Sequence, residues 1–183
     1  MTDRSPRSDA LSNRIRIVEA ARTLVDSTAT LRLNAVAKAA GVGQGTLYRH
    51  FPTREALLIE LYRTDVELLV TAAHDLLTRH DAVAAVSLWF DRVAAYARIK
   101  HGVLAALEPT AGHLLTAGSA SSIVDAVTMM LDAGKAEGSI RGDIDAGDVL
   151  LLLGFLSRLE GPDAAEQATR GLSVLLNGLR TRP

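Results

Sequence analysis

The sequence predicts an all-α fold of about nine helices, in which a three-helix N-terminal head (residues 10–54) precedes a larger helical body (residues 55–183). Alanine, leucine, valine and arginine dominate the composition and only 4% of residues are aromatic, which favours helices over strands. Apolar residues recur every three or four positions along most of the chain. The 183 residues, 48% of them apolar, are enough to bury a core.

Several classes of function are excluded or disfavoured by composition. The absence of cysteine excludes disulfide frameworks, thiolate zinc sites and cysteine nucleophiles. The five histidines lack the spacing of metal ligands and no catalytic motif is present, so we expect no metal, no cofactor and no enzymatic activity. There is no signal peptide and no apolar run of membrane-spanning length. We therefore expect a cytoplasmic protein without a membrane partner.

The charge is divided unevenly along the chain. Residues 1–54 hold nine lysines and arginines against four acids, a net charge of +5. Residues 55–183 hold eleven basic and seventeen acidic residues, a net charge of −6. This asymmetry indicates a head that binds a polyanion and a body that does not.

The first helix is expected over residues 11–26, after a polar and disordered arm at residues 1–9. In that arm, Arg4 and Arg7 would reach phosphates if the head docks on DNA. The helix is predicted from apolar residues at helical spacing: Leu11, Ile15, Val18, Ala21 and Val25.

Two short helices follow, over residues 34–40 and 44–51. Gly41 stands where a left-handed residue ends the first, and Gly43 is an acceptable N-cap for the second. Two short helices joined by a tight turn indicate a helix-turn-helix, whose second helix enters the major groove of DNA. On spacing alone, an ordinary helical corner with a solvated face remains the alternative.

The second helix of this pair has an apolar and a polar face. Leu47 and Phe51, four positions apart, are expected to face inward. Of the outward residues, Gln44 suits adenine edges and Arg49 suits guanine or phosphate. Thr46 and Tyr48 suit phosphate oxygens, and Gly45 permits a close approach. His50 is left open between a phosphate contact and a packing role.

A long fourth helix is predicted over residues 54–79. Thr53 is placed to cap it, and Glu55 in its first turn favours the helix dipole. Arg54 is a candidate phosphate ligand, because both its charge and the helix N-terminus attract anions.

The body is expected to contain five further helices, over residues 82–100, 103–107, 119–137, 145–159 and 163–179. The predicted breaks fall at Gly102, Pro109 to Gly118, Gly138 to Gly142 and Gly161-Pro162. Asp145 begins one helix as an N-cap. The cluster of Asp143, Asp145 and Asp148 lacks the spacing and the closing glutamate of a calcium loop.

Four motifs in the head point to a known family: Ala-Gly-Val at 40–42, Gly-Thr-Leu-Tyr at 45–48, His-Phe at 50–51 and Arg-Glu-Ala-Leu at 54–57. Together they closely resemble the DNA-binding head of TetR-family transcriptional regulators, over about residues 11–60. The resemblance implies a repressor that binds double-stranded operator DNA. It places eight residues at DNA-facing positions: Asn34, Gln44, Gly45, Thr46, Tyr48, Arg49, His50 and Arg54.

Two positions depart from the family pattern. The family often begins its second helix with a threonine or serine that contacts phosphate, where this chain has Arg32-Leu33-Asn34, and Gly43 replaces a serine. Asn34 either supplies the missing cap or projects to a base or phosphate, and we favour the second.

The resemblance also implies that the body dimerises and encloses a small-molecule site. The last two helices would form a four-helix homodimer interface, with these residues: Leu152, Phe155, Leu156, Leu172, Leu175, Leu176 and Leu179. The unidentified effector would meet an apolar cavity with a few polar handles, lined by Trp89, Phe90, Tyr96, His101, His113, Met129, Met130 and Phe155. For each of these residues, ordinary core packing is the competing interpretation.

The leading hypothesis is therefore a two-state switch, in which the effector shifts the dimer toward a spacing of its heads that fits the operator poorly. Two other classes of function stay open. One is a helical interaction module whose head docks on acidic protein surfaces, and the other is an uncharacterised helical enzyme.

Overall fold

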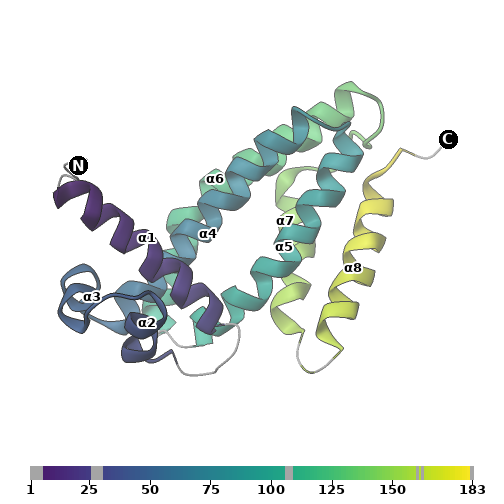
Figure 1. Cartoon of the computed structure of the whole chain (residues 1–183). Helices are drawn as coiled ribbons and strands as arrows, with labels where there is room; N and C mark the ends of the chain where they lie inside the picture. The colour runs from purple at the N-terminus through teal and green to yellow at the C-terminus, as the bar shows by residue number, and fades with distance from the viewer. Residues whose placement is uncertain (1–5, 26–30, 106–108, 160, 162, 182–183) are drawn as a thin grey trace. The chain divides into compact units, whose positions relative to one another are not determined.

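The computed structural model describes residues 6–25, 31–105, 109–159, 161 and 163–181, with the backbone alone for residues 6–8, 97–105 and 109–120 (Figure 1). The described residues form eight α-helices, one 3-10 helix and a single isolated β-bridge. The all-α prediction is confirmed. The helices are α1 (Pro6–Val25), α2 (Leu33–Ala39), α3 (Gln44–His50), α4 (Arg54–Leu77), α5 (Ala82–Ala105), α6 (Pro109–Ala136), α7 (Ala146–Leu153), η1 (Gly154–Arg158) and α8 (Ala164–Leu179).

The chain divides into two compact units. The head unit combines the residues up to Thr64 with Ile99–His113, and the body unit combines Asp65–Arg98 with the residues from Leu114 onward. Among the described residues, no helix has the length and apolar character needed to cross a membrane.

In the head unit, α2 packs against both α1 and α3. Their inward faces form a small apolar core with the first turns of α4: Ile17, Val18, Ala21, Leu31, Val36, Ala37, Leu47, Phe51, Leu57, Leu58 and Leu61. The prediction that Leu47 and Phe51 face inward is confirmed, because their exposed fractions are 0% and 2%.

The apolar face predicted for α1 is partly wrong. Leu11 and Ile15 are 62% and 50% exposed, whereas Ile17 is fully buried. Two overlapping stripes run along this helix and share Val18, so helical spacing did not distinguish between them. The helix also begins at Pro6, so the end of the arm expected to be disordered is helical. Arg4 and the side chain of Arg7 lie outside the described residues.

Two predicted breaks in the body are wrong. Gly102 does not interrupt α5, which runs to Ala105. Residues 103–105 of the short helix expected over 103–107 therefore belong to α5. Helix α6 begins at Pro109 rather than near residue 119. One glycine costs a helix only about 1 kcal/mol relative to alanine. Proline is well tolerated at the first helical position, so neither residue had to mark a loop.

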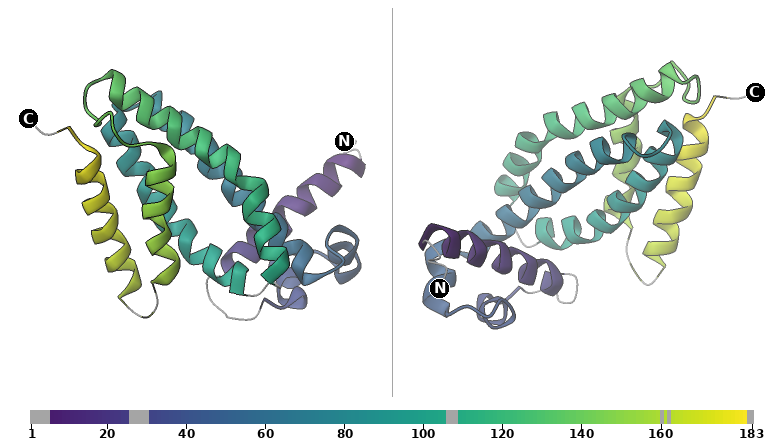
Figure 2. Two further views of the ribbon diagram at one scale, coloured as in Figure 1. Left: turned by 180° about the vertical axis from the view of Figure 1, so that it is seen from behind. Right: turned by 45° about the horizontal axis from the view of Figure 1, so that its top comes forward.

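Trp89 of α5 is the largest fully buried side chain in the described core of the body unit. Its indole Nε1 donates a buried hydrogen bond of 2.9 Å to the backbone carbonyl of Leu69 in α4. Phe90, Met130 and Leu131 are also buried in this core. Helices α7 and α8 lie side by side at one end of the body unit (Figure 2). An alanine Cβ at Gly171 would lie 2.5 Å from the ring of Phe155, so α8 approaches η1 closely there.

Candidate nucleic-acid interface

The turn between α2 and α3 is fixed by hydrogen bonds around Gly41. Gly41 has a φ of +63°, the left-handed conformation predicted for this position. Its N–H donates to the Lys38 carbonyl at 3.2 Å, and the N–H of Val42 donates to the Ala37 carbonyl at 3.0 Å. This pair of bonds is the Schellman arrangement that ends a helix at a glycine. The turn therefore defines where the next helix starts.

Helix α3 is short and begins at the predicted cap. Gly43 is the N-cap, with extended backbone, and its carbonyl accepts the N–H groups of Thr46 and Leu47 at 2.9 and 3.1 Å. At the other end, the N–H of Phe51 donates to the Leu47 carbonyl at 2.8 Å. Leu47 is the buried residue of α3, so its remaining residues are available on the surface of the unit to different degrees.

The exposed face of α3 consists of Gln44, Gly45, Tyr48 and Arg49, which form two adjacent stripes at i, i+4 spacing. Tyr48 is 46% exposed, which is a large fraction for an aromatic side chain. A Cβ placed on Gly45 would have no neighbouring atom within 4 Å. Space around this residue is therefore open, so packing within the chain does not require a glycine at this position.

Two further predicted residues, Thr46 and His50, lie beside this face, and Arg49 makes a hydrogen bond within it. Arg49 Nε donates to the carbonyl of Gly45, one turn earlier, at 3.1 Å. Thr46 and His50 are half-buried. The ring of His50 lies 6.4 Å from that of Phe51. The structure thus gives His50 a packing contact and partial access to solvent at the same time.

The start of α4 also carries a predicted residue. The Thr53 hydroxyl accepts the N–H of Ala56 at 3.1 Å, so the predicted cap is confirmed. Arg54 follows it and is half-buried. Its Nε is shielded from solvent and has no hydrogen-bond partner in the described part of the chain. A guanidinium at a helix N-terminus is suited to bind an anion, because the helix dipole adds to its charge.

Asn34 does not cap α2. The N-cap is Arg32, in extended backbone, and its side chain makes no capping hydrogen bond. Asn34 lies inside the helix and is exposed. The capping alternative for Asn34 is therefore wrong, and its contact with DNA stays a prediction.

Two arginines of α1 contact the segments on either side of α3, which the sequence did not predict. Arg16 donates to the carbonyl oxygens of Ala40 and Gly41. Arg14 pairs with Glu60 of α4 at 3.0 Å, and its guanidinium lies 4.7 Å from the centre of the Phe51 ring. Sequence reasoning counted both only as positive charge, because nothing in the local pattern distinguishes them from solvated arginines.

The predicted effector-site residues are distributed between the core and its edge. Trp89, Phe90 and Met130 are buried in the body core, and Tyr96, Met129 and Phe155 are half-buried against it. The hydroxyl oxygen of Tyr96 is shielded from solvent. The side chains of His101 and His113 lie outside the described residues. Which of these residues touch an effector stays a prediction.

The predicted dimer residues separate by burial. Leu156, Leu172 and Leu179 are buried in the core of this chain's own body unit. Phe155, Leu175 and Leu176 are half-buried, and Leu152 is exposed. Two further apolar residues that the prediction omitted are the most exposed of the large hydrophobic residues that the structure describes, Leu151 at 79% and Val174 at 73%.

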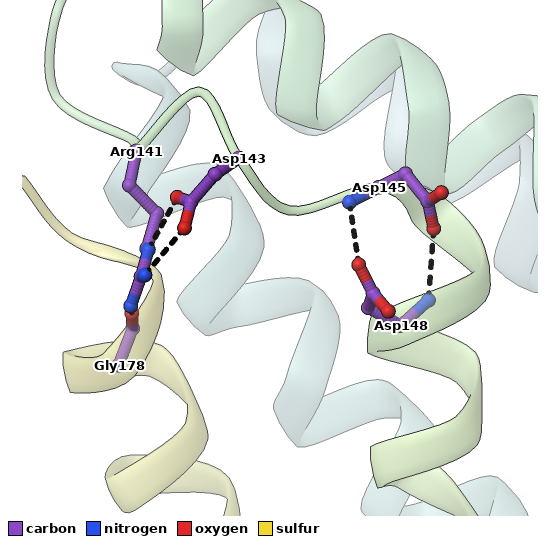
Figure 3. Close-up of polar contacts among 5 residues, drawn as sticks. All are labelled: Arg141, Asp143, Asp145, Asp148 and Gly178. Atoms are coloured by element: carbon purple, nitrogen blue, oxygen red, sulfur yellow. Dashed lines mark hydrogen bonds and ion pairs between the residues drawn. The ribbon is translucent and has the colours of Figure 1, made fainter.

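The acidic cluster after α6 is used within the chain (Figure 3). Arg141 Nε and Nη2 donate to the two carboxylate oxygens of Asp143, each at 2.6 Å. The hydrogen bonds from Arg141 hold the pKa of Asp143 below its usual value. Asp145 and Asp148 form a capping box in which each carboxylate accepts the other's N–H at 3.0 Å. The predicted N-cap role of Asp145 is confirmed.

In the part of the chain that the structure describes, no group of three or more acidic or histidine side chains is arranged to hold a metal ion. The site that stands out instead is the head unit. It presents a polar, aromatic and cationic helix face after a tight turn, which is the arrangement of helix-turn-helix DNA-binding proteins.

Comparison with known proteins identifies the family. Residues 17–61 match the model described as "Bacterial regulatory proteins, tetR family", and residues 81–181 match "Transcriptional regulator SbtR-like, C-terminal domain". The chain belongs to the TetR family of DNA-binding transcriptional regulators, which is not a family of enzymes.

Solved structures and curated proteins agree with this assignment. A TetR transcriptional regulator from Streptomyces coelicolor is 35% identical, with a TM-score of 0.81 over 93% of this chain and 99% of that one. A TetR regulatory protein from Mycobacterium vanbaalenii is 26% identical, with a TM-score of 0.78 over 96% and 99%. HTH-type regulators of Staphylococcus aureus are 39% identical over 67 residues, so the match spans 36% of this chain and 36% of theirs.

Proposed function

We propose that this protein is a homodimeric repressor that binds a near-palindromic operator through α3 and leaves it when a small-molecule effector binds the body. The observation that carries the proposal is the exposed face of α3, with open space at Gly45. Packing within the chain does not require this glycine, which lies between polar residues on a helix-turn-helix. A residue without a side chain there lets the backbone of α3 approach a base edge closely.

Different residues would serve different parts of the interface. Gln44 and Arg49 would read base edges, and Thr46, Tyr48 and Asn34 would contact the phosphate backbone or nearby bases. Arg54 would bind a phosphate, with the N-terminus of α4 adding its dipole. His50 is placed at the edge of this surface. The DNA-binding part would end at residue 54 and the effector-binding and dimerisation part would follow it.

The dimer would form across α7 and α8. Leu151, Leu152 and Val174 are exposed apolar residues on these two helices, and a second copy would cover them. A two-fold axis at this face repeats the head, so two recognition helices would meet half-sites about 34–36 Å apart or a multiple of that distance. Such a protein would act in the cytoplasm, where bacterial operator DNA is found.

Selection of operators from random duplexes at defined salt concentrations tests the proposal. We expect a near-palindromic consensus, protected by the protein in footprinting, with an affinity that falls steeply as salt rises. Binding without that salt dependence would favour an interaction module for proteins. Turnover of a bound small molecule would favour an enzyme. A library that yields no consensus would contradict the proposal.

The effector needs a separate experiment, because no side chain identifies its class. A thermal-shift screen of small molecules would give candidates, each then tested for release of the selected operator. A compound that stabilises the protein and lowers operator affinity is the expected effector. Compounds that stabilise the protein and leave affinity unchanged would argue against the switch.

A further inference from the structure

Helix α3 is too short to fix its own position. It has seven residues, fewer than two full turns, and Leu47 is its buried side chain. Its pose therefore depends on the turn before it and on Phe51, its C-cap residue, after it. The turn before α3 and the residue after it each contact an arginine of α1.

At the front end, Arg16 holds the end of α2. Arg16 Nε and Nη2 donate to the Ala40 carbonyl at 3.0 and 2.6 Å, and Nη2 also donates to the Gly41 carbonyl at 2.7 Å. These carbonyls belong to the C-cap and to the left-handed glycine of the turn. A cation at the C-terminus of a helix is favoured by its dipole, and three bonds from one planar guanidinium fix the direction of the chain.

At the rear end, Arg14 lies between α4 and Phe51. Its Nε and Nη2 approach Glu60 Oε1 at 3.1 and 3.0 Å, and the Glu60 side chain is only 15% exposed. The same guanidinium lies over the Phe51 ring, 4.7 Å from its centre, which is within the range of a cation–π contact. Arg14 thus connects the end of α3 to the first turns of α4.

We propose that Arg14 and Arg16 are positioning residues for operator recognition, which hold the two ends of α3 in register and make no phosphate contact. The inference rests on the proposed function, since it concerns how the same helix reads DNA. In both guanidiniums, Nε and Nη2 contact groups of the protein. The positive charge of the head therefore serves partly to shape the reading helix and partly to attract the polyanion.

The prediction follows from the separation of base contacts and phosphate contacts. A displaced α3 misaligns the groups that read bases, whereas exposed cations still meet the phosphates of any duplex. Loss of Arg16 should therefore lower the affinity for the selected operator and leave the affinity for random duplex and the salt slope unchanged. A lost phosphate contact would lower both affinities and reduce the slope by about 0.9.

The experiment compares the full-length parent with Arg16→Ala, Arg16→Lys and Arg54→Ala on the selected operator and on random duplex, over a range of salt. The active fraction of each preparation is measured by stoichiometric titration. For Arg16→Ala we expect at least a fivefold loss on the operator, about the effect of one mismatched base pair, and less than twofold on random duplex. Arg16→Lys keeps the charge but loses the planar donors. Its affinity for the operator should lie between those of Arg16→Ala and the parent.

Arg14→Met should show the same signature as Arg16→Ala, because it removes the contacts with Glu60 and Phe51. Arg63→Ala is the matched control. Arg63 Nη2 pairs with the same Glu60 carboxylate at 3.1 Å, but from within α4 and three residues away. Removing it should change operator affinity less than twofold.

Each outcome either supports or overturns the positioning role of Arg16. A reduced salt slope with loss on both duplexes, as expected for Arg54→Ala, would make Arg16 a phosphate ligand and overturn the proposal. Unchanged operator affinity would also overturn it. If Arg16→Ala does not fold, Arg16→Lys gives the decision. If the parent itself selects no operator, the proposed function fails first, and that result is separate from every comparison among the variants.

Discussion

At the scale of single residues, Gly45 separates stability from DNA binding. Apart from the adjoining residues and backbone of its own helix, a methyl group there meets no atom of the described residues within 4 Å, and alanine is the better helix former. Gly45→Ala should raise the free energy of unfolding by up to about 1 kcal/mol. The same methyl group should obstruct the approach to a base edge and weaken operator binding by about 1–3 kcal/mol. Urea unfolding and operator titration measure the two effects.

Gly178 of α8 supplies the control for this prediction, because its missing Cβ also has no neighbour within 4 Å. Gly178→Ala should leave operator affinity unchanged. Equal affinity of parent and Gly45→Ala for the operator would show that DNA does not approach α3 at this residue.

Gly41 makes the opposite prediction, a loss of stability. Its φ of +63° is costly for residues with a Cβ, and an alanine Cβ would lie 3.3 Å from Arg16 Nη2. Gly41→Ala should lower the free energy of unfolding by about 1–2 kcal/mol. Gly41→Asn should lower the free energy of unfolding by less than Gly41→Ala, because asparagine tolerates the left-handed conformation better than alanine. An alanine variant as stable as the parent would mean that the turn relaxes without cost.

At this scale the sequence allowed the caps to be predicted and did not allow the long-range contacts to be predicted. Gly43, Thr53 and Asp145 were identified because capping depends on neighbours within three residues. Arg16 bonds to residues 24 and 25 positions away, and Arg14 to a residue 46 positions away. Such partners are set by how the helices pack, which helical periodicity does not specify.

At the scale of elements, local signals located the short helices better than the long ones. The boundaries of α2 and α3 depend on Gly41 and on Pro52, which no neighbouring interaction overrides. In α5 and α6, many consecutive helical hydrogen bonds outweigh one glycine, and Pro109 fits a first turn. The segment expected as one helix over 145–159 instead changes to a 3-10 helix at Gly154.

The connection between α6 and α7 should respond to acid through Asp143. The Arg141 hydrogen bonds lower the pKa of Asp143, so the pair stabilises the fold above the usual pKa of an aspartate. That contribution is lost as pH falls through the lowered pKa of the folded state. The parent should therefore be more stable than Asp143→Asn at neutral pH, and this difference should disappear in strong acid.

Unfolding of both proteins by urea at a series of pH values checks this expectation. Both side chains are well exposed, at 47% and 64%, so added salt should also shrink the difference. A difference that grows on acidification would contradict the assigned direction of the pKa.

At the scale of the whole molecule, the prediction concerns assembly. Leu151→Lys and Val174→Lys place charges on the proposed dimer face and should shift the protein to monomers in sedimentation experiments. Both residues are largely exposed in the single chain, so the substitutions should leave the core of each monomer intact. Leu68→Lys is the control, because Leu68 is an exposed leucine of α4, at 53%. A monomeric parent, or a Leu68→Lys variant that dissociates equally, would contradict the proposed interface.

The sequence predicted the fold class and family correctly because the motifs of the head are dense and local. The body showed only an apolar pattern. That pattern does not distinguish a residue buried in its own chain from one exposed on the proposed dimer face. Leu156 and Leu151 are both leucines of the same apolar stretch, and they are 7% and 79% exposed. Burial in three dimensions was needed to divide them.

The contact between Gly171 and Phe155 has a consequence for how the protein can evolve. Because a Cβ at Gly171 would lie 2.5 Å from the phenyl ring, any larger residue there requires a smaller or displaced one at 155. Gly134 and Ile140 are related in the same way, at 2.4 Å. Among close relatives, a larger residue at 171 should therefore occur only with a changed residue at 155, and a larger one at 134 only with a changed residue at 140. A substitution of either glycine that is acceptable in one lineage is then inaccessible to another by a single mutation.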